Sequence, residues 1–98
     1  MVQIGIIRIR KPGGIYNDHS AISHYQWRNE TTGETYTWDR MTMVNWILQN
    51  PRENVAYVKD FKGNIAYCKV VRNQFGTMFL ETYSDNTMSD NILSLPQI

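Results

Sequence analysis

The side chains able to carry chemistry are few in this sequence, and their spacing does not form a catalytic set. The 98 residues contain one cysteine and two histidines. Asp18 and His19 are neighbours and His24 lies five positions further on, which is not the spacing of a zinc site. A nucleophile would have to be Cys68, which lies in a strand-like run where a small core residue is expected. We therefore expect no catalytic residues, no metal and no cofactor.

Two carboxylates near the C-terminus, Asp85 and Asp90, have the chemistry of a general acid–base pair. Their neighbours favour structural roles instead. Asp85 precedes Asn86 in a turn, and Asp90 precedes an apolar segment whose first amides need an acceptor. We predict that the C-terminus forms a structural clasp whose apolar side chains pack under the sheet. The residues of this clasp are Tyr83, Asp85, Asp90, Asn91, Leu93 and Leu95.

Positive charge is concentrated near the N-terminus, although the whole chain is almost neutral. Ten lysines and arginines stand against nine aspartates and glutamates, and a net charge of +1 excludes nucleic-acid binding through bulk charge alone. Arg8, Arg10 and Lys11 form a local basic edge, which either contacts an anionic partner or is simply solvated. The candidate binding residues are Arg8, Arg10, Lys11, Tyr16, His19 and Tyr25.

Alternating apolar residues predict that β-strands carry most of these groups. Residues 2–10 have the pattern of a strand whose apolar phase changes between Ile6 and Ile7, so we expect a β-bulge beside Gly5. The other predicted strands cover residues 21–29, 55–59, 65–71 and 77–83, with a short one over 35–38.

One long helix is predicted over residues 39–49. Asp39 is a typical N-cap residue, and a proline follows the last helical position closely. Met43, Val44, Ile47 and Leu48 have the spacing of one apolar helix face, so all four are expected to be buried against the sheet.

These elements predict an α+β fold in a single domain over residues 1–98. We expect a small antiparallel sheet of about five strands, with the helix at about 39–49 packed on one face and a short helical turn near the C-terminus. One cysteine cannot form an intramolecular disulfide, so a reducing cytoplasm is the expected compartment. Neither a signal peptide nor a membrane-spanning segment is evident.

The C-terminal stretch also carries a recognisable motif. It has Thr82-Tyr83-Ser84-Asp85, a short gap, and then Asp90-Asn91-Ile92-Leu93-Ser94-Leu95-Pro96. The chain resembles domain-of-unknown-function family 3892, a family of small bacterial and phage-associated proteins. The upstream features that are also similar are Arg10-Lys11 with Gly13-Gly14, His19 with Ile22 and Trp27, Trp46-Ile47, and Ala56-Tyr57-Val58-Lys59-Asp60. Ile92 and Asn86 depart from the leucine and glycine that the pattern favours. The resemblance implies a fold but no activity.

Three hypotheses about function follow from these observations. The first is a non-enzymatic interaction module in which a sheet face or a loop docks a protein partner. The second is a binder of nucleic acid or nucleotide that uses Arg8, Arg10 and Lys11 with the nearby tyrosines. The third is an enzyme, which would need a deep pocket that gathers His19 and Asp18. The first is favoured because the sequence lacks a consistent catalytic set.

Overall fold

A mixed seven-stranded sheet carries one helix in the computed structural model, which describes residues 2–12, 19–59, 63–84, 87–89, 92–93 and 95–98. Along the sheet the strands follow the order β3-β2-β1-β4-β5-β6-β7. Their bounds are β1 Val2–Arg10, β2 His24–Arg28, β3 Thr35–Asp39, β4 Asn54–Lys59, β5 Ile65–Arg72, β6 Met78–Ser84 and β7 Thr87–Ser89. Helix α1 spans Arg40–Gln49, and a short 3-10 helix, η1, spans His19–Ala21.

The predicted α+β class holds in coarse form, but three details of the prediction are wrong. The sheet has seven strands instead of about five. It is also mixed, because β4 lies parallel to β1 after the chain returns through α1. The described residues near the C-terminus form a turn at Ile92 and Leu93 and a bridge at Gln97, where a helical turn was expected. This segment pairs instead with β1, since the Ile9 N–H donates to the Pro96 carbonyl at 3.0 Å and the Ile98 N–H donates to the Ile9 carbonyl at 2.9 Å.

The predicted bulge in β1 is confirmed. Ile6 is paired with Trp27 and Arg8 with Gln26, so Ile7 is the extra residue of β1. The insertion returns the apolar side chains to the same face of the sheet after the phase change in the sequence.

The predicted helix is confirmed, except at one position of its buried face. The Thr42 N–H donates to the Asp39 side chain at 2.7 Å, and this hydrogen bond lowers the pKa of the Asp39 carboxyl. Met43, Val44 and Ile47 are buried, whereas Leu48 is 47% exposed. Each helical residue is rotated by about 100° from the previous one. Leu48 therefore lies beyond the stripe that faces the sheet.

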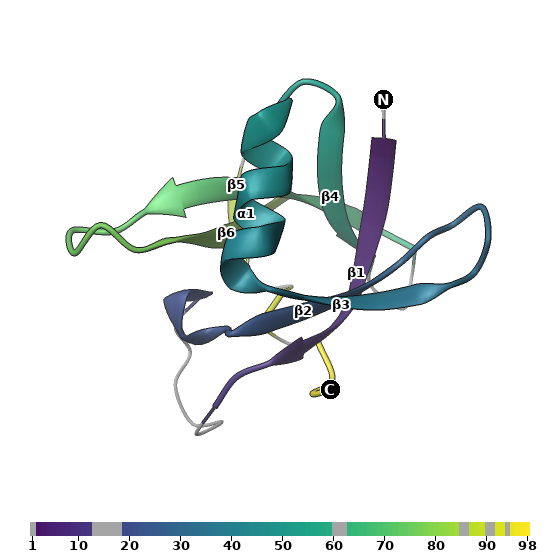
Figure 1. Ribbon diagram of the computed structural model, residues 1–98, viewed down its shortest axis with the longest axis horizontal. Coiled ribbons are helices and arrows are strands. Elements are labelled where there is room, and N and C mark those ends of the chain that lie inside the picture. The colour runs from purple at the N-terminus through teal and green to yellow at the C-terminus, as the bar shows by residue number, and fades with distance from the viewer. Residues whose placement is uncertain (1, 13–18, 60–62, 85–86, 90–91, 94) are drawn as a thin grey trace.

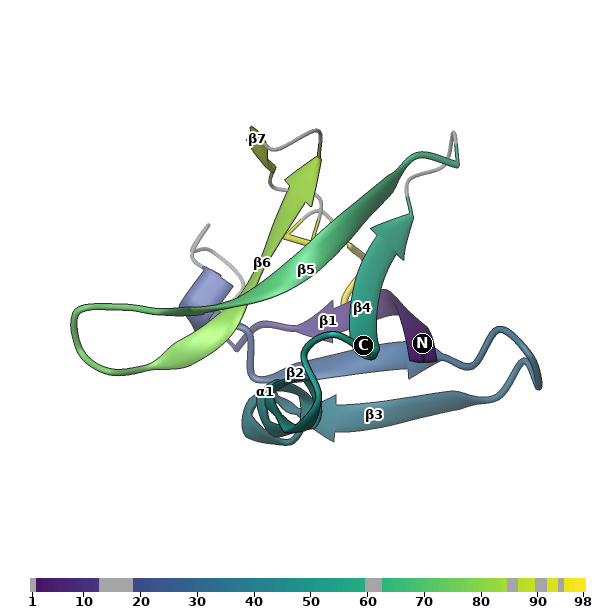
Figure 2. The same ribbon diagram turned by 90° about the horizontal axis from the view of Figure 1, so that it is seen from above.

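The core lies between α1 and the face of the sheet that α1 covers (Figure 1). Strands β1 to β3 run in a different direction from β5 and β6, and β4 joins the two halves (Figure 2). The second half folds back far enough for β6 to contact η1. The buried side chains that fill the interior include Ile4, Ile6, Ile9, Ile22, Tyr25, Val44, Val58, Leu80 and Ile92. We call this covered face the inner face, and the opposite face the outer face.

No helix in the described part of the chain is both long enough and apolar enough to cross a membrane.

Candidate functional site

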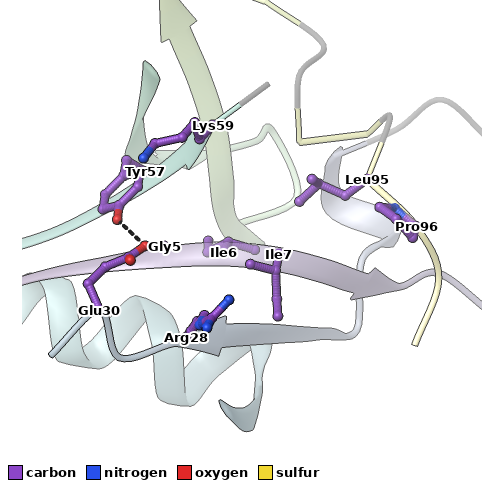
Figure 3. A pocket seen from close by; sticks show the side chains of 9 residues that line it. All are labelled: Gly5, Ile6, Ile7, Arg28, Glu30, Tyr57, Lys59, Leu95 and Pro96. Atoms are coloured by element: carbon purple, nitrogen blue, oxygen red, sulfur yellow. Dashed lines mark hydrogen bonds between the residues drawn. The ribbon is translucent and has the colours of Figure 1, made fainter. Parts of the chain in front are cut away.

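A pocket of about 430 Å³ opens on the outer face, where β1 is bulged (Figure 3). Gly5, Ile6 and Ile7 lie along its floor, with Tyr57 and Lys59 on one side and Leu95 and Pro96 on the other. Arg28 and Glu30 complete the lining. We refer to these nine residues as the Arg28–Lys59 pocket. Its volume is in the range of small-ligand sites.

The pocket exists because β1 changes its neighbour along one edge. Residues Val2 to Gly5 pair with β4 in parallel register. Beyond the bulge, Ile9 instead forms a parallel bridge with Gln97 of the C-terminal segment. Strand β4 and the C-terminal segment thus reach the same edge of β1 at different points, and the space between them forms the pocket.

Tyr57 and Glu30 are joined at one end of this pocket. The Tyr57 hydroxyl donates to Glu30 Oε1 at 2.7 Å. Burial, followed by this hydrogen bond, raises the pKa of Tyr57 to about 12. A Cβ at position 5 would lie 3.1 Å from the Tyr57 ring and hydroxyl and 3.2 Å from Glu30 Oε1. Glycine at position 5 therefore allows the tyrosine ring and the glutamate to lie across the strand.

The charges around the pocket favour an anion. Arg28 and Lys59 contribute two cations, and both side chains are exposed. Glu30 is the one carboxylate among the nine lining residues, and it already accepts a hydrogen bond from Tyr57. Ile7 on the floor and Leu95 on one wall add half-buried apolar surface. Arginine binds carboxylates through paired hydrogen bonds, so the arrangement suits an anionic group attached to an apolar one.

Comparison with known families confirms the family that the sequence resembles. The profile of a family described as "Protein of unknown function (DUF3892)" matches residues 5–96. The chain belongs to the DUF3892 family. No curated protein and no solved structure gave a significant match. The match includes the floor and both walls of the Arg28–Lys59 pocket, from Gly5 to Pro96, but the DUF3892 description names no activity.

The predicted basic edge of this DUF3892 protein is only partly assembled. Arg8 and Arg10 are exposed. They pair with Gln26 and His24 of β2, so they lie on the same outer face as Arg28, which pairs with Gly5. Lys11 differs, because it is only 8% exposed and its backbone N–H donates to the Gln97 side chain at 3.0 Å. Two of the three predicted cations therefore remain available on this face.

The other predicted binding residues do not gather beside Arg8 and Arg10. Tyr25 is 0% exposed in the core, where burial raises its pKa far above the ordinary value, so it offers no surface to a ligand. His19 lies in η1, and its Nε2 is buried without a hydrogen-bond partner among the described residues. His24, which was not among the predicted binding residues, does pair with Arg10, and its Nδ1 lies 2.8 Å from the Ser23 hydroxyl. Tyr16 is outside the described residues.

The predicted clasp is described only in part. Leu93 and Leu95 are partly buried and pack against the core. Tyr83 has described backbone, which pairs with Tyr67 and Met88. Among the described residues of this segment, Ile92 is fully buried, and the predicted clasp did not include it. Asp85, Asp90 and Asn91 lie outside the described residues, so their turn and capping roles remain predictions.

Four polar residues of the pocket were missed by sequence reasoning, namely Arg28, Glu30, Tyr57 and Lys59. A partial signal was present for two of them. Tyr57 and Lys59 alternate with Ala56 and Val58, a pattern that places them on the opposite face from the core. No comparable pattern links Glu30 to Tyr57, because their contact joins a loop to a distant strand.

Proposed function

We propose that this protein is a non-enzymatic interaction module that docks a protein partner, and that its Arg28–Lys59 pocket receives an acidic segment of that partner. The observation that carries the proposal is the pairing of two exposed cations with an apolar wall in one pocket. A segment with aspartate or glutamate beside an apolar residue matches both features.

The state of Glu30 supports this choice of ligand. A free carboxylate beside Arg28 would compete with an incoming anion for the guanidinium. Glu30 Oε1 instead accepts the Tyr57 hydroxyl, and Gly5 leaves room for that contact. The hydrogen bond holds Glu30 at Tyr57 without neutralising it, and the lining still carries two cations against one carboxylate, an excess that can pair with an acidic side chain.

The chemistry of the described residues favours binding over catalysis. The nine residues that line the pocket include no histidine, cysteine, serine or threonine. Burial raises the pKa of the Cys68 thiol to about 12, so very little of the reactive thiolate forms at neutral pH. We also propose that the protein is cytoplasmic and that it has a bacterial or phage-associated origin.

Nucleic-acid binding is the second candidate, and one observation favours it. Arg8, Arg10 and Arg28 share the outer face, so a backbone with repeated phosphates could contact all three. The overall charge of +1 weighs against this alternative, because phosphate binding usually depends on a larger excess of cations.

A peptide-display selection tests the main proposal without assuming a partner. Random linear peptides are selected on the wild-type protein at low salt and counter-selected on the R28Q/K59Q variant. We expect the surviving sequences to be rich in aspartate or glutamate next to apolar residues. The R52Q/R72Q variant, which loses the same charge from two exposed sites elsewhere, should retain these peptides.

Two results would contradict the proposal. One is a selection that yields no acidic consensus. The other is equal loss of binding in R28Q/K59Q and R52Q/R72Q, which would mean that overall charge attracts the peptides. Binding of a single-stranded oligonucleotide that is lost in R8Q/R10Q and weakens steeply with salt would favour the alternative.

A further inference from the structure

A second pocket, on the inner face, has a different chemical character. It measures about 500 Å³ and lies beside α1, at the beginning of β1. Its lining consists of Val2, Gln3, Ile4, Trp27, Asn29, Thr31, Trp38 and Trp46. We refer to this set as the tryptophan pocket. It shares no residue with the Arg28–Lys59 pocket.

All three tryptophans of the chain line this pocket, although they come from three elements. Trp27 is in β2, Trp38 in β3 and Trp46 in α1. Trp38 lies 4.8 Å from Trp27 and 5.9 Å from Trp46 between ring centroids, at interplanar angles of 65° and 59°. Trp46 is held in position because Asn54 Nδ2 donates to its backbone carbonyl at 2.8 Å.

The three indoles contact one another at inclined angles, so a ligand must pack against the parts of the rings that remain open. A nucleobase or a sugar needs an open, flat ring face for stacking. One face of Trp27 is already occupied by Tyr36, at a centroid distance of 4.7 Å and an angle of 29°. Trp38 and Trp46 are half-buried, so part of each indole remains open to the pocket. The compact pyrrolidine ring of proline packs against partly exposed aromatic side chains of this kind in aromatic-lined grooves.

The polar groups of the pocket point to a neutral ligand rich in acceptors. None of the eight lining residues has an ionisable side chain. Trp27 is only 8% exposed, and its indole N–H is buried without a hydrogen-bond partner among the described residues. Asn29 Oδ1 accepts the N–H groups of Thr31 and Thr32, which leaves the Asn29 NH₂ group as a further donor.

Buried donors without acceptors are rare in folded proteins, so the Trp27 N–H needs an explanation. A carbonyl oxygen supplied by a ligand would satisfy it. Proline-rich segments present carbonyl oxygens while lacking N–H groups at each proline, and they dock in aromatic-lined grooves as preformed extended helices.

We infer that the tryptophan pocket binds a proline-rich peptide segment, with pyrrolidine rings against the open parts of Trp38 and Trp46 and a peptide carbonyl accepting the Trp27 N–H. This site is separate from the Arg28–Lys59 pocket, so it can fail without affecting the proposal made for that pocket. It would give the module two different contacts on its partners.

Tryptophan fluorescence is a direct probe, because every tryptophan of the chain lies in this site. The ligand is a capped, uncharged proline-rich peptide of about ten residues, long enough for three extended turns. We expect a saturable change in emission that a capped glycine-serine peptide of equal length does not cause. The R28Q/K59Q variant should bind this peptide with unchanged affinity, which separates the two sites.

Substitution tests the hydrogen bond. W27F keeps an aromatic ring but removes the N–H, and we expect about tenfold weaker binding, the effect of losing one hydrogen bond in a buried site. F75A is the matched aromatic control, because Phe75 is 82% exposed in the turn between β5 and β6 and lies outside the pocket. It should bind as the wild type does. Should W27F fail to fold, the indole N–H resonance of Trp27 in the wild-type protein is followed by NMR instead, and it should move downfield on saturation.

Several results would overturn the inference. They are no saturable response to the proline-rich peptide, wild-type affinity in W27F, and a Trp27 indole resonance that does not move. A response to a neutral oligosaccharide but not to the peptide would also overturn it, because the pocket would then bind sugars.

Discussion

The two pockets differ in the way that the fold creates them. The tryptophan pocket lies among neighbouring strands and α1, and its rings contact one another directly. The Arg28–Lys59 pocket lies where β1 exchanges β4 for the C-terminal segment, and one of its walls depends on residues far away in the sequence. Changes at the C-terminus should therefore leave the tryptophan pocket intact, whereas they should disrupt the Arg28–Lys59 pocket. The comparison also separates a neutral site rich in hydrogen-bond donors from a cationic one.

The largest effect should come from Ile92→Ala. This side chain is fully buried in the core next to the wall formed by Leu95 and Pro96. Removing it leaves a cavity, and we expect the free energy of unfolding to fall by about 2–5 kcal/mol in chemical denaturation. Leu48→Ala is the control, because Leu48 is half exposed, and it should cost about 1 kcal/mol or less. A larger loss for Leu48→Ala than for Ile92→Ala would contradict the assigned core.

Gly5→Ala should have an intermediate effect, confined to the outer pocket. The added Cβ would press on Tyr57 and Glu30 at just over 3 Å, and both must shift to make room. We expect a loss of about 1–3 kcal/mol, together with weaker binding of acidic peptides. Tryptophan emission should remain at the wild-type value. A changed emission maximum would show that the two pockets are not structurally independent.

Tyr57→Phe should have a smaller effect that depends on pH. It removes the hydrogen bond to Glu30, at a cost of about 0.5–1.5 kcal/mol. Folding raises the pKa of Tyr57. The contribution of its neutral hydroxyl to the free energy of unfolding is therefore fully present below about pH 10 and is lost as the pH rises toward about 12. Denaturation of the two proteins across this range should show their stabilities converging. A difference that stays constant up to pH 12 would mean that the Tyr57 hydroxyl does not stabilise the fold in this way.

Asp39→Asn should have the smallest effect on stability, and this effect should appear at acidic pH. Hydrogen bonding from Thr42 lowers the pKa of Asp39, so its ionised form stabilises the fold above the ordinary carboxyl value. That contribution disappears as the pH falls through the lowered value. Asparagine also caps helices but does not titrate there, so the variant should lack this part of the acid dependence. Identical acid-unfolding curves for the two proteins would contradict the capping assignment.

Local features of this fold could be predicted from the sequence, because local chemistry determines them. The bulge follows from the phase change between Ile6 and Ile7, and the helix start follows from Asp39. The parallel pairing of β1 with β4 could not be predicted, since it depends on how α1 returns the chain to the sheet. Tyr25 was misplaced as a ligand contact because an alternating strand does not reveal which of its faces is covered.

The candidate site was harder to predict than the fold. Arg28 and Lys59 are separated in the sequence and line one pocket only because β1 lies between their strands. The pocket also needs the contact between Ile9 and Gln97, which joins the two ends of the chain. Long-range pairings of this kind leave no periodic signal in either segment.

The most direct test of the account is an NMR titration of the wild-type protein with a capped peptide that alternates aspartate and leucine. The account predicts saturable amide shifts at Gly5, Ile7, Arg28, Lys59 and Leu95. The R28Q/K59Q variant should bind about tenfold more weakly or worse, since charge-assisted hydrogen bonds are lost, while R52Q/R72Q should bind normally. Shifts that map elsewhere, or an affinity that R28Q/K59Q leaves unchanged, would contradict the assignment of this pocket as the binding site.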